Sequence, residues 1–169
     1  MIDKTYVTTM ARYNSWQNAW VLYAVERLEP GERMADRGLF FGSIQKTLSH
    51  LLWGDQMWLH RFAGTPLPAA ADIARSSDMW SDWPVFADER RRFDGVIESW
   101  AAELDPAWLD GDLSWYSGSA KREVSRPRAL LVTHFFNHQT HHRGQVHAAL
   151  TGLGMVTEVT DLPFLPDKL

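Results

Sequence analysis

The sequence predicts an all-α protein folded as one four-helix bundle, and three observations support this fold class. Four long segments carry apolar residues every three or four positions, which is the spacing of one face of a helix. The chain of 169 residues has the length of one domain, residues 1–169, and can bury a single hydrophobic core. It shows no internal repeat and no low-complexity tract. Four amphipathic helices can bury their apolar faces against one another in a bundle.

The first two helices are bounded by residues that cap or stop a helix. The first spans about residues 3–28, because Pro30 and Gly31 end its periodic pattern. The second begins after Ser43, whose side chain suits the N-cap position, and ends at Gly64. The apolar stripe of the first consists of Tyr6, Met10, Tyr13, Trp16, Trp20 and Tyr23, and that of the second of Ile44, Leu48, Leu51, Leu52, Trp58 and Phe62.

The third and fourth helices follow a loop rich in alanine, proline and serine. The third begins near Pro84, and the fourth begins around residues 125–127 and runs to Gly152, about 25 residues or about 37 Å. Between them, residues 113–124 allow a small β-hairpin with its turn at residues 117–118. The apolar face of the third helix consists of Phe86, Phe93, Ile97, Trp100 and Leu104.

The composition excludes several classes of protein and of binding partner. The chain is 45% hydrophobic and 22% charged, as soluble globular proteins are, and no apolar run approaches a bilayer span. Residues 1–16 lack the basic start and apolar stretch of a signal peptide, so we expect a cytoplasmic protein. A net charge of -4 argues against nucleic acid as a partner. Because the chain has no cysteine, a metal must be held by histidine and carboxylate, and thiol chemistry would need an external thiol.

Four of the seven histidines lie within residues 137–147, "NHQTHHRGQVH". At 100° per residue, His138 and His142 fall on the apolar stripe of the fourth helix, whereas His141 and His147 lie off it. A buried imidazole pair without partners would cost a few kcal/mol, so hydrogen bonds in the core or a bound metal must satisfy it. The remaining residues of the stripe are Leu131, Phe135, Val146 and Ala149.

The spacing of the histidine pair is compatible with metal binding. His138 and His142 are one helical turn apart and can share one ion. Gln139 stands where a zincin peptidase has its catalytic glutamate, which argues against a peptidase. His50 is the candidate third ligand, and Gly54, one turn later, leaves the space that an open coordination position would require. From the residues alone, a hydrogen-bonded core pair and a ligand pair remain equally open.

Motifs along nearly the whole chain resemble the DinB family of damage-inducible proteins. The matching segments, in order, are "MARYNSWQNAWVL", "GLFFGSIQKTLSHLLWGDQMWLHRFAG", "VTHFFNHQTHHRGQVHAALTGLG" and "TDLPFLP". The resemblance implies a four-helix bundle with a long crossover, a homodimer, and one divalent ion held by His50, His138 and His142. Zinc or nickel is the expected metal, with iron, manganese and cobalt as alternatives.

The resemblance also indicates a class of reaction. Related family members are thiol-dependent S-transferases or isomerases that use low-molecular-weight thiols such as bacillithiol or mycothiol. We therefore expect a metal-dependent hydrolase or transferase that takes a small-molecule substrate and a low-molecular-weight thiol. The alternative is a non-catalytic dimeric metal-binding protein with a role in stress or damage response. Gln145, three positions after His142, is expected on the same face as a catalytic residue that orients a ligand or the nucleophile.

Three further residues are expected to have structural roles. Arg143 and Gly144 lie on the side of the fourth helix opposite the histidine pair. Arg143 predicts a partner carboxylate, and Gly144 predicts the close approach of another backbone. Asp55 projects onto the aliphatic side of the second helix and is not expected as a fourth ligand.

Overall fold

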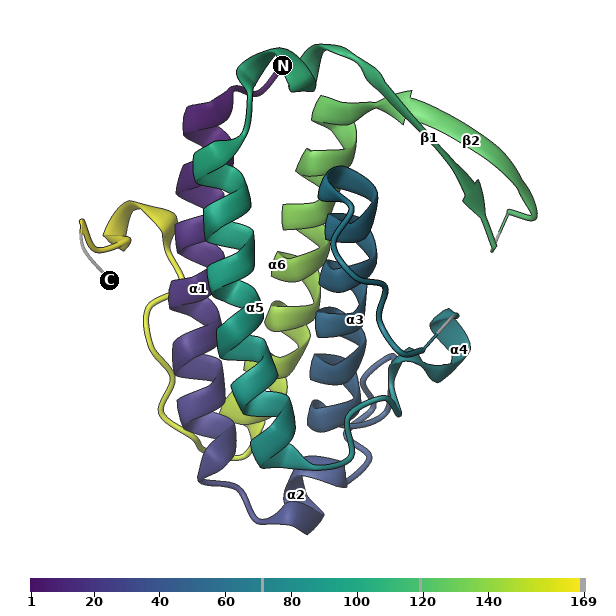
Figure 1. Cartoon of the computed structure of the whole chain (residues 1–169). Helices are drawn as coiled ribbons and strands as arrows, with labels where there is room; N and C mark the ends of the chain where they lie inside the picture. Colours follow the sequence, from purple (N-terminus) through teal and green to yellow (C-terminus); the bar gives the residue numbers. More distant parts are fainter. Residues whose placement is uncertain (71, 119, 168–169) are drawn as a thin grey trace.

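Four long helices run the length of the molecule in the computed structural model, which describes residues 1–70, 72–118 and 120–167 (Figure 1). Each packs against two of the others, because α1 and α3 both contact α5 and α6. The predicted four-helix bundle is confirmed. The four helices are α1 (Lys4–Glu26), α3 (Ile44–Ala63), α5 (Trp83–Glu103) and α6 (Arg128–Gly152).

The order of the helices requires one long crossover. The helices α3 and α5 run in the same direction, so the connection from Gly64 to Asp82 returns from one end of the bundle to the other (Figure 1). A bundle of this topology keeps its remaining connections short. The shorter helices are α2 (Pro30–Met34), α4 (Ile73–Ser76) within the crossover, and the 3-10 helices η1 (Pro106–Asp110) and η2 (Leu162–Phe164).

Local capping decides where two of the helices begin and end. The side chain of Ser43 accepts a hydrogen bond from the backbone N–H of Lys46, and Gly64 ends α3 in the left-handed conformation at φ 68°. Both boundaries agree with the prediction. Pro30, predicted only to stop the first helix, is also the first residue of α2, where its missing N–H costs nothing. Glu29 completes a capping box before it.

A two-stranded hairpin leads into α6. Strand β1 (Asp112–Ser117) pairs antiparallel with β2 (Arg122–Pro127), so the predicted hairpin is confirmed. The helix α6 begins at Arg128 with Pro127 as its N-cap, one residue beyond the predicted start around residues 125–127, because those residues are still paired in β2. Trp115 lies on the inner side of β1, and its ring meets that of Trp58 of α3 at 5.6 Å between centroids. The hairpin therefore carries an aromatic side chain to the face of the bundle formed by α3.

The hydrophobic core extends along the bundle and draws on every long helix. Burial of such side chains supplies the main driving force for folding, about 1.5–3 kcal/mol for each large apolar residue. No helix of the described residues is long and apolar enough to cross a bilayer. The largest fully buried apolar side chains are Val7, Ile44, Leu51, Leu52, Leu59, Phe86, Ile97, Phe135, Phe136 and Leu150.

A buried polar cluster interrupts this core and joins all four long helices. Arg90 of α5 donates hydrogen bonds to Asp55 of α3 at 2.6 Å and to Asp94 at 2.7 Å. Gln139 of α6 donates to the other oxygen of Asp55 at 3.0 Å. Burial raises the pKa of Asp94 to about 6, although Arg90 opposes the rise. The members of this polar cluster are Asn14 and Asn18, Asp55, Arg90 and Asp94, and Gln139 and Arg143.

Arg143 enters the polar cluster through amides instead of a carboxylate. Its Nη1 donates to the side-chain oxygens of Asn14 and Asn18 on α1. No carboxylate oxygen of the described residues lies within 4.0 Å of it, so the predicted ion pair is wrong. Burial lowers the pKa of Arg143 to about 10, which still leaves it protonated at pH 7. The prediction for Gly144 is also wrong, because a Cβ there would meet nothing within 4 Å.

Replacing Asp55 tests whether the polar cluster supports the fold. Asp55→Ala leaves the buried charge of Arg90 without one of its two carboxylates and should lower the free energy of unfolding by about 3–5 kcal/mol. Asp88→Ala on the exposed surface of α5 is the control and should change it by no more than about 0.5 kcal/mol. Urea denaturation measures both. Equal stability of the two variants would contradict a structural role for the cluster.

Candidate metal centre

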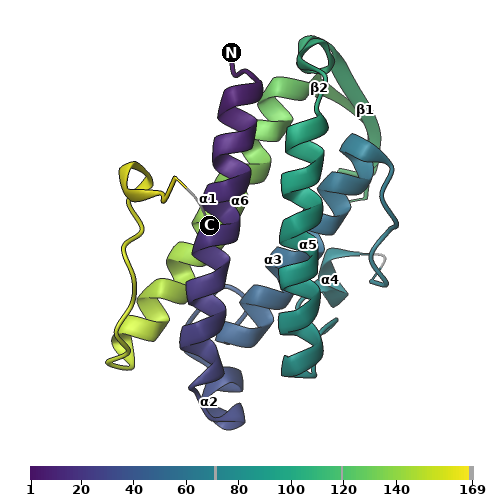
Figure 2. The ribbon, with the colours of Figure 1, turned by 60° about the vertical axis from the view of Figure 1, so that its left-hand side comes forward.

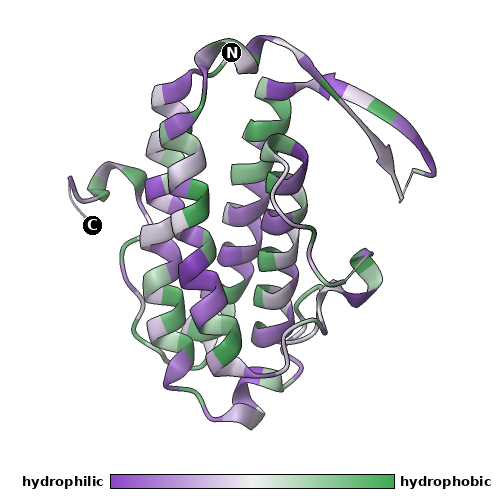
Figure 3. Ribbon diagram, in the orientation of Figure 1, coloured by the Kyte–Doolittle hydropathy of each residue, from purple (hydrophilic) through white to green (hydrophobic). Residues whose placement is uncertain are grey.

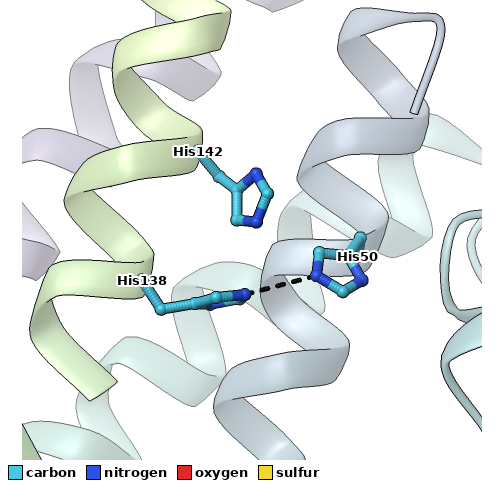
Figure 4. Close-up of side chains that lie close together, drawn as sticks. All are labelled: His50, His138 and His142. Carbon is cyan, nitrogen blue, oxygen red and sulfur yellow. Dashed lines mark hydrogen bonds between the residues drawn. The ribbon is translucent and has the colours of Figure 1, made fainter. Parts of the chain in front are cut away.

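Three imidazoles from two helices converge between α3 and α6 (Figure 4). His50 comes from α3, and His138 and His142 come from successive turns of α6. One ring nitrogen of each lies within 4.8 Å of those of the other two. The Nε2 atoms of His50 and His138 are 3.3 Å apart. The structure thus brings together the three residues predicted as ligands.

The donor set fits a divalent metal ion. Two nitrogens bound tetrahedrally to zinc at about 2.0–2.1 Å are about 3.3–3.4 Å apart, and the Nε2 atoms of His50 and His138 have this separation. No carboxylate of the described residues belongs to the group. Imidazole ligands suit zinc, nickel, iron and copper. Three protein ligands leave a coordination position open, which is typical of catalytic sites and not of closed structural ones.

Gly54 makes room for one of the ligands. A Cβ at this position of α3 would lie 3.0 Å from Cε1 of His138, closer than such atoms normally approach. The prediction that Gly54 keeps a coordination position open is therefore wrong, because the ring of His138 occupies that space. The glycine lowers the helix propensity of α3 by about 1 kcal/mol and lets an imidazole of α6 approach the helix closely.

A serine of the crossover orients His50. The Nδ1 atom of His50 is 2.8 Å from Oγ of Ser76, and the hydroxyl of Ser76 donates its proton to the carbonyl oxygen of Ile73 at 2.7 Å. Ser76 must therefore accept a hydrogen bond from Nδ1–H of His50. This tautomer leaves the lone pair of Nε2 facing the other two histidines. Ser76 could not be predicted from the sequence, because only the folding of the crossover brings it to α3.

Gln145 orients His142 in the same way. Its Oε1 can only accept, so at 2.9 Å it takes a hydrogen bond from Nδ1–H of His142 and leaves Nε2 of that ring unprotonated. The Nε2 of Gln145 lies 3.2 Å from Nε2 of His141. Gln145 therefore lies on the same face of α6 as His142 and contacts its ring, and a catalytic role for Gln145 stays a prediction.

Burial keeps the three imidazoles neutral. It lowers the pKa of His50 to about 4 and that of His138 to about 3, and the neighbouring imidazole of His142 lowers both further. Burial also lowers the pKa of His142, while its hydrogen bond to Gln145 opposes this effect. At pH 7 each ring offers a free lone pair, so a metal would displace no proton.

The aromatic side chain of Phe41, which was not predicted from the sequence, covers the centre. The ring of Phe41 stacks on that of His50, with centroids 4.0 Å apart and planes 27° apart. The chain reaches this position through a tight turn, bridged from Leu39 to Gly42, in which Gly42 adopts φ 81°. The pair of phenylalanines before a glycine is the only signal that could have indicated this turn. Trp53 lies on α3 with its ring centroid 5.7 Å from that of His50.

The other histidines of α6 do not join the centre. His141 is exposed, and its ring stands edge-to-face with that of His142 at 4.9 Å between centroids, outside the group of three. His134 is exposed and packs against Trp58 and against the ring of His138. His147 faces α1, where its ring stands edge-to-face with that of Trp20. The helical periodicity therefore assigned the histidines to their faces correctly.

The chain resembles proteins of one family in sequence and in fold. The model of the DinB family matches residues 1–168. Protein DinB of Bacillus subtilis (strain 168) is 27% identical over 153 residues, which cover 88% of this chain and 87% of that protein. The crystal structure of a DinB-like protein from Bacillus cereus ATCC 10987 matches with a TM-score of 0.62 at 14% identity, over 85% of this chain and 90% of that chain. At this identity the structural match shows the fold alone.

Alanine variants test the ligand set. Replacing His50, His138 or His142 removes one of three donors and should reduce bound metal to a small fraction of the wild-type content. His147→Ala on the opposite face of α6 is the control and should keep the wild-type content. Elemental analysis after dialysis against a trace of zinc measures the content. Equal loss from all four variants would refute this set of ligands.

A pair of variants tests the hydrogen bond of Gln145. Gln145→Leu leaves Nδ1–H of His142 without an acceptor and should weaken metal binding about 10- to 100-fold. Gln145→Glu keeps an acceptor oxygen at the same distance along the side chain and should retain most of the affinity. Competition with a chromophoric chelator gives both constants. Wild-type affinity in Gln145→Leu would exclude a role in holding the ligand.

Proposed function

The chain belongs to the DinB family, and from this membership and the three-histidine centre we propose a metal-dependent transferase with a low-molecular-weight thiol as cosubstrate. The proposal rests on the donor set of the centre. This set consists of three neutral imidazoles, with no carboxylate and no cysteine. Such a set leaves the full charge of a divalent ion and an open position to the substrates. His138 is only half-buried, which is consistent with access from solvent.

Because the chain has no cysteine, the sulfur atom of the proposed reaction must belong to a separate thiol molecule. A divalent ion at the centre would lower the pKa of a bound thiol and supply a thiolate near pH 7. The chain has no cysteine, so a thiol nucleophile must come from a separate molecule. In the proposed reaction the sulfur bonds to an electrophilic carbon, the leaving group departs with the bonding electrons, and the thiol proton passes to solvent.

The residues around the centre position its groups. Burial lowers the pKa values of His50 and His138 well below 7, so at pH 7 these rings are neutral and available as metal ligands. Ser76 and Gln145 hold two of the rings in the tautomer that presents Nε2. Gln145 therefore acts in this proposal by positioning His142.

Aromatic side chains beside the centre favour an electrophile with an apolar body. Phe41 and Trp53 both lie against His50. Trp58 packs against Trp115 of the hairpin and against His134, whose ring neighbours that of His138. These rings offer apolar surface on both sides of the histidines, where a small substrate could be desolvated.

Cobalt-substituted protein tests the function. Titration with bacillithiol, mycothiol or glutathione should produce a sulfur-to-cobalt charge-transfer band, and the active thiol should then consume a generic alkylating substrate. His138→Ala should lose both the band and the rate, because the centre loses a donor, whereas His147→Ala should keep both.

A negative result in the cobalt titration would distinguish the two expected functions. A metal-loaded protein that shows no spectral change with any of the three thiols, and no rate above that of the metal-free protein, would refute the transferase. Bound metal without turnover would then favour the non-catalytic metal-binding protein.

A further inference from the structure

A cavity lies on the side of α6 opposite His138 and His142. Its volume is about 240 Å³, and its walls come from α1, α6 and the C-terminal tail, residues 153–167. Arg143, Gly144 and His147 line it from α6, about half a helical turn away from His138 and His142. The α1–α6 cavity is therefore separate from the candidate metal centre and takes no part in the proposed function.

The C-terminal tail forms the outer wall of the α1–α6 cavity. Figure 2 shows the tail leaving α6 and turning back along the side of the bundle. Two side chains of α1 hold it there: Tyr13 Oη donates to the carbonyl oxygen of Thr160 at 2.6 Å, and Gln17 Nε2 donates to that of Val159 at 3.1 Å. These hydrogen bonds link segments more than a hundred residues apart, so tertiary structure creates the cavity.

Arg143 presents unused hydrogen-bond donors in this cavity. The residue is 5% exposed, and only its Nη1 is hydrogen-bonded, to Asn14 and Asn18. Its Nε and Nη2 have no partner among the described residues. The acidic members of the polar cluster, Asp55 and Asp94, are both bonded to Arg90 and not to Arg143. A buried guanidinium with free donors on a cavity is suited to bind an anion, and its planar fork matches a carboxylate.

The other walls indicate the size and character of the anion. Trp20 and Tyr13 contribute aromatic rings, and no Asp or Glu is among the described residues that line the cavity. Asp161 follows Thr160 but is exposed and not part of the wall. The volume is below that of pockets for drug-sized ligands. The buried polar cluster balances two guanidiniums with two carboxylates, so the cavity offers the free hydrogen-bond donors of Arg143 and no excess positive charge. Two donors of one guanidinium match the two oxygens of one carboxylate, and aromatic walls match a small apolar body.

We propose that the α1–α6 cavity binds a small organic monocarboxylate, whose two oxygens accept hydrogen bonds from Nε and Nη2 of Arg143. The apolar part of the ligand packs against Trp20 and Tyr13. Inorganic phosphate, with a higher charge and no apolar part, fits the cavity less well.

Propionate is the probe that tests this site, and propionamide is its uncharged control. The indole N–H of Trp20, which donates to Gln17 at 2.8 Å, reports on the cavity by NMR, and its resonance is identified with Trp20→Phe. Propionate added to the full chain at constant ionic strength should shift this resonance to saturation. Propionamide should not shift it. An equal response to both compounds, or tighter binding of inorganic phosphate than of propionate, would overturn the carboxylate site.

Three variants make the test specific for the cavity. Arg143→Gln removes the charge and should weaken propionate binding at least about tenfold. Gly144→Leu fills open space in the wall without touching the polar cluster and should abolish binding, whereas Gly144→Ala adds only a Cβ that meets nothing and should preserve it. If Arg143→Gln does not fold, the Gly144 pair alone decides. Unchanged binding in Gly144→Leu, or no saturable shift in the wild type, refutes the proposal.

Discussion

A hydrogen bond between Gln139 of α6 and Asp55 of α3 sets the register on which the histidine centre depends. Gln139 follows His138 in the chain, and Asp55 follows Gly54, so this bond and the contact of His138 with Gly54 form together. Sliding the two helices by one turn would leave buried polar groups unpaired, at a cost of about 1–3 kcal/mol each. The apolar core tolerates several registers more easily than this bond does. The polar cluster therefore gives the bundle specificity where hydrophobic packing alone would not.

The helix α6 is unusual because it buries polar groups on two sides. One side presents His138 and His142 toward α3, and the other presents Arg143 toward α1. Its middle turns are accordingly hydrophilic, while apolar residues occupy turns nearer its ends (Figure 3). A buried polar group without a partner costs free energy, and other helices supply partners for most of those on α6, although Oε1 of Gln139 and two donors of Arg143 have none among the described residues. The two sides carry different chemistry: neutral nitrogen donors on one, and a cation with spare hydrogen-bond donors on the other.

Loops as well as helices build the candidate centre. The crossover supplies Ser76, which sets the tautomer of His50, and the turn before α3 supplies Phe41, which covers its ring. The effect of both is electrostatic. Apolar cover disfavours imidazolium, and the hydrogen bond to Ser76 directs the remaining lone pair toward the other two rings. The three imidazoles are thus neutral and oriented before a cation binds, and the long crossover contributes to this orientation through Ser76.

Local features of the sequence determined the helices and the faces of the histidines, and tertiary packing decided the contacts between them. Ser43 and Gly64 mark the ends of α3 through bonds within a few residues, and the period of 3.6 places His138 and His142 on one face. Family resemblance, and not periodicity, selected His50. The partners of Gly54 and Arg143 could not be predicted in this way, because periodicity says which residues share a face but not which side chain of another helix meets it. Which side chains meet depends on the register of the two helices. Buried hydrogen bonds between distant segments establish this register, and they form only in the folded chain.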